Sequence, residues 1–394
     1  MTITGKQAFT VMIAASFAST IGGLPFNSLP ILLGSLADSF SLSPQQTGFL
    51  GSACFAGFFV GTLAAVFIIS RFCWRKLTVF AALAASTALL LSSFAPVQLQ
   101  MPLWAVIGFF AALMTCLGLR IMGEMANKER ALGLRQGIEL GVTALVLFIL
   151  PAFVTVYYGY QGTAIALVMI ILGLSLSAIF LPQGTSSDEA GPGLREQMRL
   201  PGIAWLALFV FFLFGAGNIG LWAFLERMGN SLELAPAELG TVFAVLKLLG
   251  GAAAFVIAIV GDRLGMRVPY LVVLVVTLAG LMLLWQADSF LSFAFGAWIW
   301  EVGFTWGCVY QTATVARLDP QGRAIMLIPA AFALSSMVGP ALAGMLVAES
   351  YLPLLLMALA STVIAVAIFG GVMAQRVRRG VPEPMEVAPV ADVL

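Results

Sequence analysis

Residues 43–48 have the sequence Ser-Pro-Gln-Gln-Thr-Gly, and residues 235–240 have the sequence Ala-Pro-Ala-Glu-Leu-Gly. Each stretch is followed by one apolar span and then by a basic stretch, Ser-Arg-Phe-Cys-Trp-Arg at 70–75 and Asp-Arg-Leu-Gly-Met-Arg at 262–267. The two copies match without a gap at an offset of 192 residues (43 pairs with 235), close to half of the 394-residue chain. Such a repeat of apolar spans is typical of a membrane protein built from two related halves.

The composition excludes a soluble globular protein. Hydrophobic residues make up 61% of the chain and charged residues only 9%, whereas soluble domains carry about 25% charged residues. A transmembrane helix needs roughly 20 apolar residues, and the alternation that marks a β-barrel is absent. We therefore expect an all-α polytopic membrane protein. Its twelve predicted spans are 8–36, 44–70, 77–95, 101–126, 131–157, 160–182, 201–227, 238–261, 268–286, 289–316, 324–348 and 352–374.

The positions of Lys and Arg predict the orientation of these spans. If the N-terminus is cytoplasmic, most of the 19 basic residues fall on cytoplasmic loops or helix ends, as the positive-inside rule requires. Arg227 alone is then placed outside. We expect both termini in the cytoplasm. The short loops and the absence of an Asn-x-Ser/Thr sequon fit a bacterial inner membrane.

One long polar loop divides the chain. It predicts residues 1–183 as an N-terminal six-helix bundle, 184–200 as a cytoplasmic linker and 201–377 as a C-terminal six-helix bundle. The tail at 378–394 contains Pro and acidic residues and is expected to be disordered.

Several function classes lack their sequence signals. The chain has no His, and its four Cys have neither disulfide nor zinc spacing, so we expect no metal site and no cofactor. No phosphate-binding glycine loop is present, which argues against ATP-driven transport by this chain alone. No nucleophile–base pair is present either, so we do not expect an enzyme.

The basic loops carry a family resemblance. Residues 262–267 match the signature that the major facilitator superfamily carries after spans two and eight, and 70–76 form a weaker copy with Ser for Asp and Cys for Gly. The stretches 124–130 and 317–323 are similar to the family's patterns after spans four and ten. The sequence resembles this superfamily over essentially its whole length. The resemblance implies two pseudo-symmetric six-helix bundles that form a secondary transporter.

In this family, acidic and basic residues of these loops are implied to brace the outward-open state. Ser70 cannot provide the anion in the first copy, and Glu124 is a possible substitute. A simpler reading is that these Arg residues only anchor the topology. The residues assigned to this conformational latch are Arg71, Arg75, Glu124, Arg130, Asp262, Arg263, Arg267, Arg317, Asp319 and Arg323.

Four ionisable residues are predicted at membrane depth: Arg120, Glu139, Lys247 and Glu301. Counting along each span at about 1.5 Å per residue places all four roughly 14–18 Å from the nearer surface. Arg120 should then pair with Glu139, and Lys247 with Glu301. Spans three, six, nine and twelve contain no such charge, and in the resembled fold these spans face lipid.

Two readings of these charges remain open. They can be buried ion pairs that only fix helix packing, or they can form a proton or substrate site at the midplane between the halves. Because the chain has no His, Glu139 and Glu301 are the candidate proton carriers. The candidate substrate-binding residues are Arg120, Lys247, Asn27, Asn218, Trp222, Trp298, Trp306, Tyr310 and Gln311.

The sequence therefore predicts a secondary active transporter that takes up a zwitterion, a weak organic acid or a polar neutral solute by alternating access, together with protons. One alternative is a proton-coupled antiporter that exports drugs or metabolites, and another is a membrane sensor that transports nothing. We expect a monomer in the lipid bilayer whose partners are a small solute and a proton or other coupling ion, and no nucleic acid.

Overall fold

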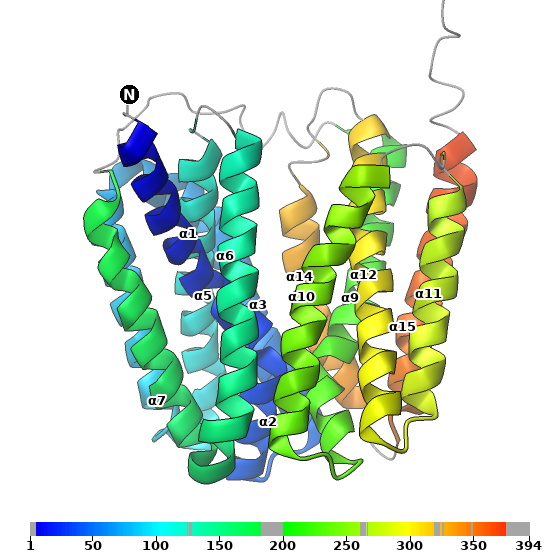
Figure 1. Cartoon of the computed structure of the whole chain (residues 1–394), viewed down its shortest axis with the longest axis horizontal. Helices are drawn as coiled ribbons and strands as arrows, with labels where there is room; N and C mark the ends of the chain where they lie inside the picture. The colour runs from blue at the N-terminus through cyan, green and yellow to red at the C-terminus, as the bar shows by residue number, and fades with distance from the viewer. Residues whose placement is uncertain are drawn as a thin grey trace, which may run out of the picture.

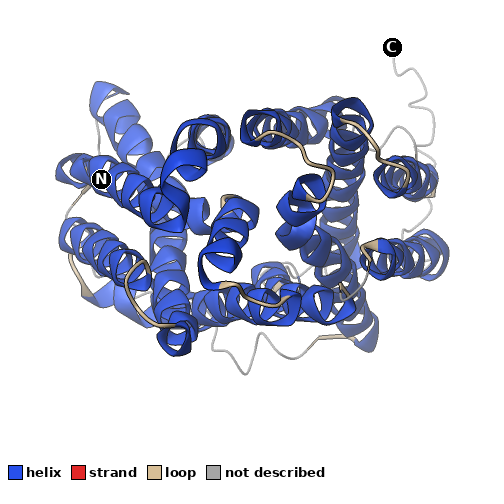
Figure 2. Ribbon diagram, turned by 90° about the horizontal axis from the view of Figure 1, so that it is seen from below, coloured by secondary structure: helices blue, strands red, loops and turns tan. Residues whose placement is uncertain are grey.

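The computed structural model describes residues 5–123, 125, 128–182, 200–260, 265, 267–318, 324, 327–347 and 350–375. Within these ranges the regular structure is helical, and no strand occurs. Figure 1 shows the helices as two bundles side by side, and Figure 2 shows the same two groups nearly end-on. This arrangement in two helical bundles is the one that the family resemblance implied.

The helices of the first bundle follow one another up and down. They are α1 (Gly5–Asn27), α2 (Leu29–Phe40), α3 (Pro44–Arg71), α4 (Trp74–Ser92), α5 (Val97–Gly123), α6 (Lys128–Ile149), the π-helical η1 (Leu150–Thr155), α7 (Val156–Ser175) and the short 3-10 helix η2 (Leu176–Phe180).

The second bundle repeats this plan. Its helices are α9 (Gly202–Asn230), α10 (Pro236–Val260), α11 (Val268–Trp285), α12 (Phe290–Leu318), α14 (Ile328–Leu346), α15 (Leu352–Val366) and the π-helical η3 (Ala367–Met373). We call the end of the molecule where α1 begins the terminal face, and the end where α2 and α9 finish the opposite face (Figure 1).

The twelve predicted spans correspond to these helices. Ten helical segments are long and apolar enough to cross a membrane, and one of them, Leu134–Phe180, contains both predicted span five and predicted span six. Its turn lies at Gly159, whose φ of 56° suits a residue without Cβ. The 29-residue helix α12 provides the tenth predicted span.

The first predicted span, 8–36, is not one continuous helix. It is split into α1 and α2 at Asn27–Ser28. Pro30 has no backbone N–H and so cannot donate to the carbonyl of Phe26 one turn earlier. That carbonyl accepts a hydrogen bond from the indole Nε1 of Trp222 in the second bundle instead, at 3.4 Å.

The sequence repeat is visible in the contacts between the bundles. α3 packs against α14, and α10 packs against α6. A Cβ on Gly48 would meet the carbonyl oxygen of Pro340, and a Cβ on Gly240 would meet that of Phe148. Gly48 pairs with Gly240 at the offset of 192, and so does Phe148 with Pro340. The repeated glycine therefore has a physical cause, because it lets two helix backbones approach at equivalent places.

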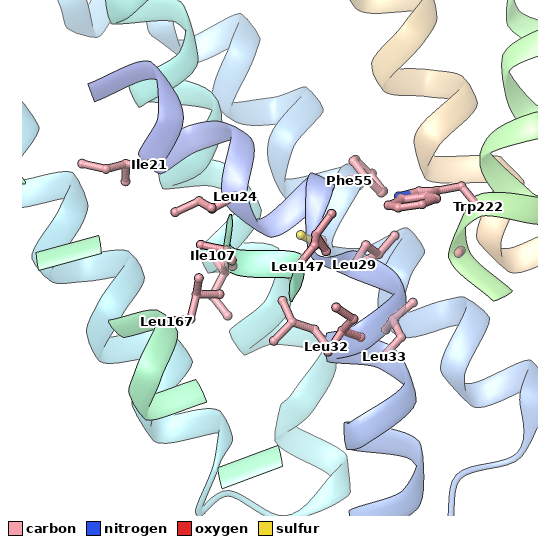
Figure 3. Close-up of a cluster of buried hydrophobic side chains, with 14 of the residues drawn as sticks. Ile21, Leu24, Leu29, Leu32, Leu33, Phe55, Ile107, Leu147, Leu167 and Trp222 are labelled. Atoms are coloured by element: carbon pink, nitrogen blue, oxygen red, sulfur yellow. The ribbon is translucent and has the colours of Figure 1, made fainter. Parts of the chain in front are cut away.

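The larger apolar core continues across both bundles. Figure 3 shows Trp222, from α9, beside Phe55 of the first bundle, and both belong to one buried apolar cluster. The ring of Phe26 packs edge-to-face on Phe55 with centroids 5.4 Å apart. Aromatic and branched side chains thus join the halves between the midplane and the opposite face.

Two glycines at the crossing of α3 and α5 give a stability prediction. A Cβ on Gly57 would clash with the backbone of Ala105, and one on Gly108 would clash with the backbone of Cys54. Because backbone cannot move aside cheaply, we expect Gly57→Ala and Gly108→Ala each to cost about 1–3 kcal/mol. The melting temperature in detergent should fall by several degrees. Gly173→Ala, which meets no atom within 4 Å, is the matched control. Equal melting temperatures for all three variants would contradict the close packing.

Candidate functional site

Three of the predicted deep charges lie at one level of the structure. Glu139, Lys247 and Glu301 each stand eleven residues after the first residue of their helix (128 to 139, 236 to 247, 290 to 301). At about 1.5 Å per residue, this is roughly 16 Å along the helix, near the middle of a membrane. α6 starts at the terminal face, whereas α10 and α12 start at the opposite face (Figure 1), so the three positions meet at mid-depth.

Glu139 is held by its own helix and by α1. Its Oε2 lies 2.6 Å from Nη1 of Arg135, one helical turn earlier, and 3.5 Å from the hydroxyl of Ser19. The same Arg135 nitrogen donates to the Ser19 hydroxyl at 2.6 Å. A Cβ on Gly23 would come within 2.5 Å of the Glu139 carboxylate, so this glycine makes room for it.

The predicted pair of Arg120 with Glu139 is wrong. Arg120 is exposed and lies in the last turn of α5, which ends at Gly123. The predicted depth of Arg120 is too large, because α5 ends at Gly123, only one turn after Arg120. Arg135 is the cation that neutralises Glu139.

Lys247 is buried, with only 7% of its surface exposed. Its ammonium lies over the ring of Trp222, 3.9 Å from the centroid, and 5.8 Å from the centroid of the Phe26 ring. Both Glu301 and Glu139 are close enough to interact with its charge. Within the described part of the chain, however, no oxygen forms a hydrogen bond or an ion pair with this ammonium.

Glu301 is also 7% exposed. A Cβ on Gly250 would lie 2.7 Å from its Oε1, so the carboxylate rests against α10 one turn beyond Lys247. Lys247, the predicted partner of Glu301, lies close enough to interact with its charge. Among the residues that the structure describes, Glu301 forms no ion pair within 4.0 Å and no hydrogen bond.

Three other candidate binding residues serve the packing of the second bundle. The indole of Trp298 donates to the carbonyl of Val242 and that of Trp306 to the carbonyl of Ala253, both at 2.9 Å. Asn218 is fully buried and accepts from Trp300 Nε1 at 2.9 Å. In this conformation these polar groups are already satisfied by protein.

The remaining candidates are Asn27, Tyr310, Gln311 and Trp222. Asn27 is buried at the bend between α1 and α2. Tyr310 is half-buried, and its carbonyl accepts from the hydroxyl of Tyr270 at 2.9 Å. The neighbouring Gln311 is buried, and its Oε1 has no hydrogen-bond partner among the described residues. Trp222 is the one aromatic candidate for which the structure shows direct contact with a charged group of the site.

The structure describes only some of the latch residues, and these lie toward the terminal face. Arg71, Arg267 and Arg317 are exposed, and Arg75 donates to the carbonyl of Leu181 at 2.5 Å. Glu124, Asp262, Arg263, Asp319 and Arg323, and the side chain of Arg130, lie outside the described residues.

A contact between the halves near the opposite face was missed by the sequence reasoning. Arg227 of α9 binds Asp38 at the end of α2 at 2.5 Å and donates to the carbonyl of Gly34 at 2.8 Å. The neighbouring Glu226 carboxylate occupies the space where a Cβ of Gly34 would lie, and its Oε1 accepts from Asn230 at 2.6 Å. We call Gly34, Asp38, Glu226 and Arg227 the clasp.

A sequence signal for the clasp existed. Gly34 pairs with Glu226, and Asp38 with Asn230, at the offset of 192. The clasp is therefore the contact of two equivalent helix ends. A pocket of about 440 Å³ adjoins it, with Asp38, Arg227 and Tyr351 among its lining residues.

Comparisons with known proteins agree with this architecture. No curated protein matches the sequence. The structure is similar to that of the nucleoside transporter NupG (TM-score 0.73, 10% identity, 95% of this chain and 99% of that chain covered). It is also similar to the xylose transporter XylE from E. coli in an inward-open conformation (TM-score 0.70, 14% identity, 97% of this chain and 98% of that chain covered). A third similar structure is that of an inward-facing bacterial homologue of the human lysosomal transporter Spinster (TM-score 0.69, 14% identity, 95% of this chain and 97% of that chain covered). The similarity of these structures concerns the fold.

The sequence itself matches the family model described as Major Facilitator Superfamily over residues 11–319, most of the chain. This match bears out the resemblance that the repeated basic loops indicated. The chain belongs to the Major Facilitator Superfamily and is an integral membrane protein of transporter type.

Proposed function

We propose that this protein takes up a small organic solute by alternating access and couples the uptake to protons. The solute is a zwitterion, a weak organic acid or a polar neutral molecule. The observation that carries the proposal is the group of Glu139, Lys247 and Glu301 at one depth, on helices of both bundles. Charged groups are costly in a membrane and concentrate where transporters bind solutes and ions.

The contacts between the bundles support one stage of this cycle. The clasp and the contacts of Gly48 and Gly240 all lie between the midplane and the opposite face. We infer that a molecule joined there admits solute to the three charges from the terminal face. In the proposed orientation the terminal face is cytoplasmic, in a bacterial inner membrane, so this conformation would release solute into the cell.

The coupled proton has two candidate carriers. The Glu139 carboxylate already pairs with Arg135 and accepts a hydrogen bond from Ser19, whereas Glu301 has no hydrogen-bond partner in the described part of the chain. A buried carboxylate without such a partner is more stable when a proton neutralises it. We therefore assign the coupled proton first to Glu301.

Metabolite accumulation in bacterial cells tests the function while the solute is still unidentified. Cells expressing the protein and cells with an empty vector are incubated in a defined mixture of isotope-labelled amino acids, organic acids, sugars and nucleosides, and the cell contents are measured by mass spectrometry. We expect at least one compound class to accumulate several-fold above the control, and a protonophore to abolish the excess. Accumulation that the protonophore leaves unchanged would refute proton coupling. Depletion of a compound from the cells would show that the protein exports this compound instead of taking it up.

A further inference from the structure

Two buried charges of opposite sign lie close together without completing an ion pair. Lys247 and Glu301 are each more than nine-tenths buried. They interact electrostatically, yet neither forms a hydrogen bond or an ion pair with any described residue. Burying a charge without a hydrogen-bonding partner costs several kcal/mol, so these groups need atoms that the protein itself does not provide.

The neighbouring charges do not fill this need. Arg135 and Glu139 already bind each other at 2.6 Å. Of the four charged groups, this leaves one cation and one anion open, and both are on the second bundle. An anionic group of a ligand would bind the open N–H donors of Lys247.

The surroundings of Lys247 indicate the body of that ligand. The ring faces of Trp222 and Phe26 hold the ammonium, and Phe26 in turn packs on Phe55 and Phe332 with centroids 5.4 and 5.7 Å apart. A cation over an aromatic face is stabilised without an oxygen partner. Because an ammonium has three N–H donors, it can bind an anion at the same time. The walls themselves favour apolar or aromatic surface.

We propose that the transported solute carries a carboxylate that binds Lys247, on an apolar or aromatic body that packs against Trp222 and Phe26. This inference rests on the proposed transport function and narrows its substrate class. It excludes neutral sugars and nucleosides as preferred substrates.

Glu301 completes the charge balance in one of two ways. If the solute is a zwitterion, its ammonium binds Glu301. If the solute is a simple weak acid, the coupled proton neutralises Glu301, and anion and proton cross together without net charge. Both cases place a carboxylate on Lys247, and matched probes distinguish them.

Calorimetric titration of the purified protein with four probes of one aromatic body tests the inference. The probes are 3-phenylpropanoate, L-phenylalanine, phenethylamine and 3-phenylpropanol, and an aliphatic set follows the same plan. We expect a carboxylate-bearing probe to bind at least tenfold more tightly than the amine and the alcohol. Preference for phenylalanine identifies the zwitterion, and preference for phenylpropanoate identifies the weak acid.

Substitution of the lysine completes the test. Lys247→Met should weaken binding of the preferred carboxylate at least tenfold, whereas Lys76→Met, on the exposed end of α4, should leave it unchanged. Since Lys247→Met leaves Glu301 as an uncompensated buried charge and can impair folding, Lys247→Met with Glu301→Gln is made as well. This double variant should fold and should no longer distinguish acid from alcohol.

The possible failures can be told apart. Binding of the alcohol as tight as that of the acid, or carboxylate binding unaffected in the double variant, would overturn the substrate class. Proton-driven accumulation of a neutral sugar or nucleoside in the cell assay would likewise overturn the class while leaving the transport function intact. If no compound accumulates in the cells and none is depleted from them, this result would contradict the transport function itself.

Discussion

For a weak-acid solute, whose coupled proton neutralises Glu301, Glu301→Gln is expected to abolish proton-driven accumulation of the solute while leaving solute exchange in place. The amide has almost the same shape as the carboxyl group but cannot carry a proton. One proton per solute and a gradient of one pH unit support about tenfold accumulation, since a tenfold ratio corresponds to about 1.4 kcal/mol. In proteoliposomes with an imposed pH gradient, the variant should equilibrate the solute to a ratio near one. Exchange of labelled for unlabelled solute should continue.

Glu139→Gln should behave differently, because Glu139 is already paired. Its removal leaves Arg135 as a half-buried cation without its carboxylate, so we expect a lower melting temperature as well as impaired transport. The matched control is Glu233→Gln in the exposed turn before α10, which should match the wild type in both assays. Full accumulation by Glu301→Gln would rule out Glu301 as the coupling carboxylate.

The sequence predicted those features that depend on the chain alone. Composition and spans established the membrane fold, and the offset of 192 residues located Gly48 and Gly240 at equivalent contacts between the bundles. Glu139, Lys247 and Glu301 lie at the expected depth because their helices are long and their starts are marked by clear turns. Depth along a helix is a one-dimensional quantity, and a count of residues is enough to obtain it.

Side-chain partners could not be obtained in this way. Trp298 and Trp306 lie on the expected helix, but their indoles bond to the backbone of α10, because the rotation of a helix about its axis depends on how it packs. The pairing of Arg135 with Glu139 was predictable from their spacing of four residues, but Arg135 was not among the four charges predicted at membrane depth. The clasp depends on which helix ends meet, and a single sequence does not specify this.

Gly34→Val is expected to hold the clasp open and to reduce transport at least tenfold. The Glu226 carboxylate fills the space where any side chain at Gly34 would begin. A branched side chain must displace the Glu226 carboxylate and disturb the neighbouring Arg227, which binds Asp38. The distance between spin labels on Gln45→Cys and Ser231→Cys, one on each bundle at the opposite face, should lengthen in a background without the four native cysteines. Gly173→Val, facing open space, is the control and should change neither the distance nor transport.

Rescue by exchange gives the sharper test, because positions 34 and 226 are equivalent in the repeat. Gly34→Glu alone would bury two carboxylates against each other, and Glu226→Gly alone would leave an empty notch between α2 and α9. The double variant places the carboxylate on α2 and the glycine on α9. The contact between the two helices then again combines one carboxylate with one glycine. We expect it to recover most of the transport and the short label distance that Gly34→Glu loses. A double variant as inactive as Gly34→Glu would show that the fit between Gly34 and Glu226 does not govern closure of the opposite face.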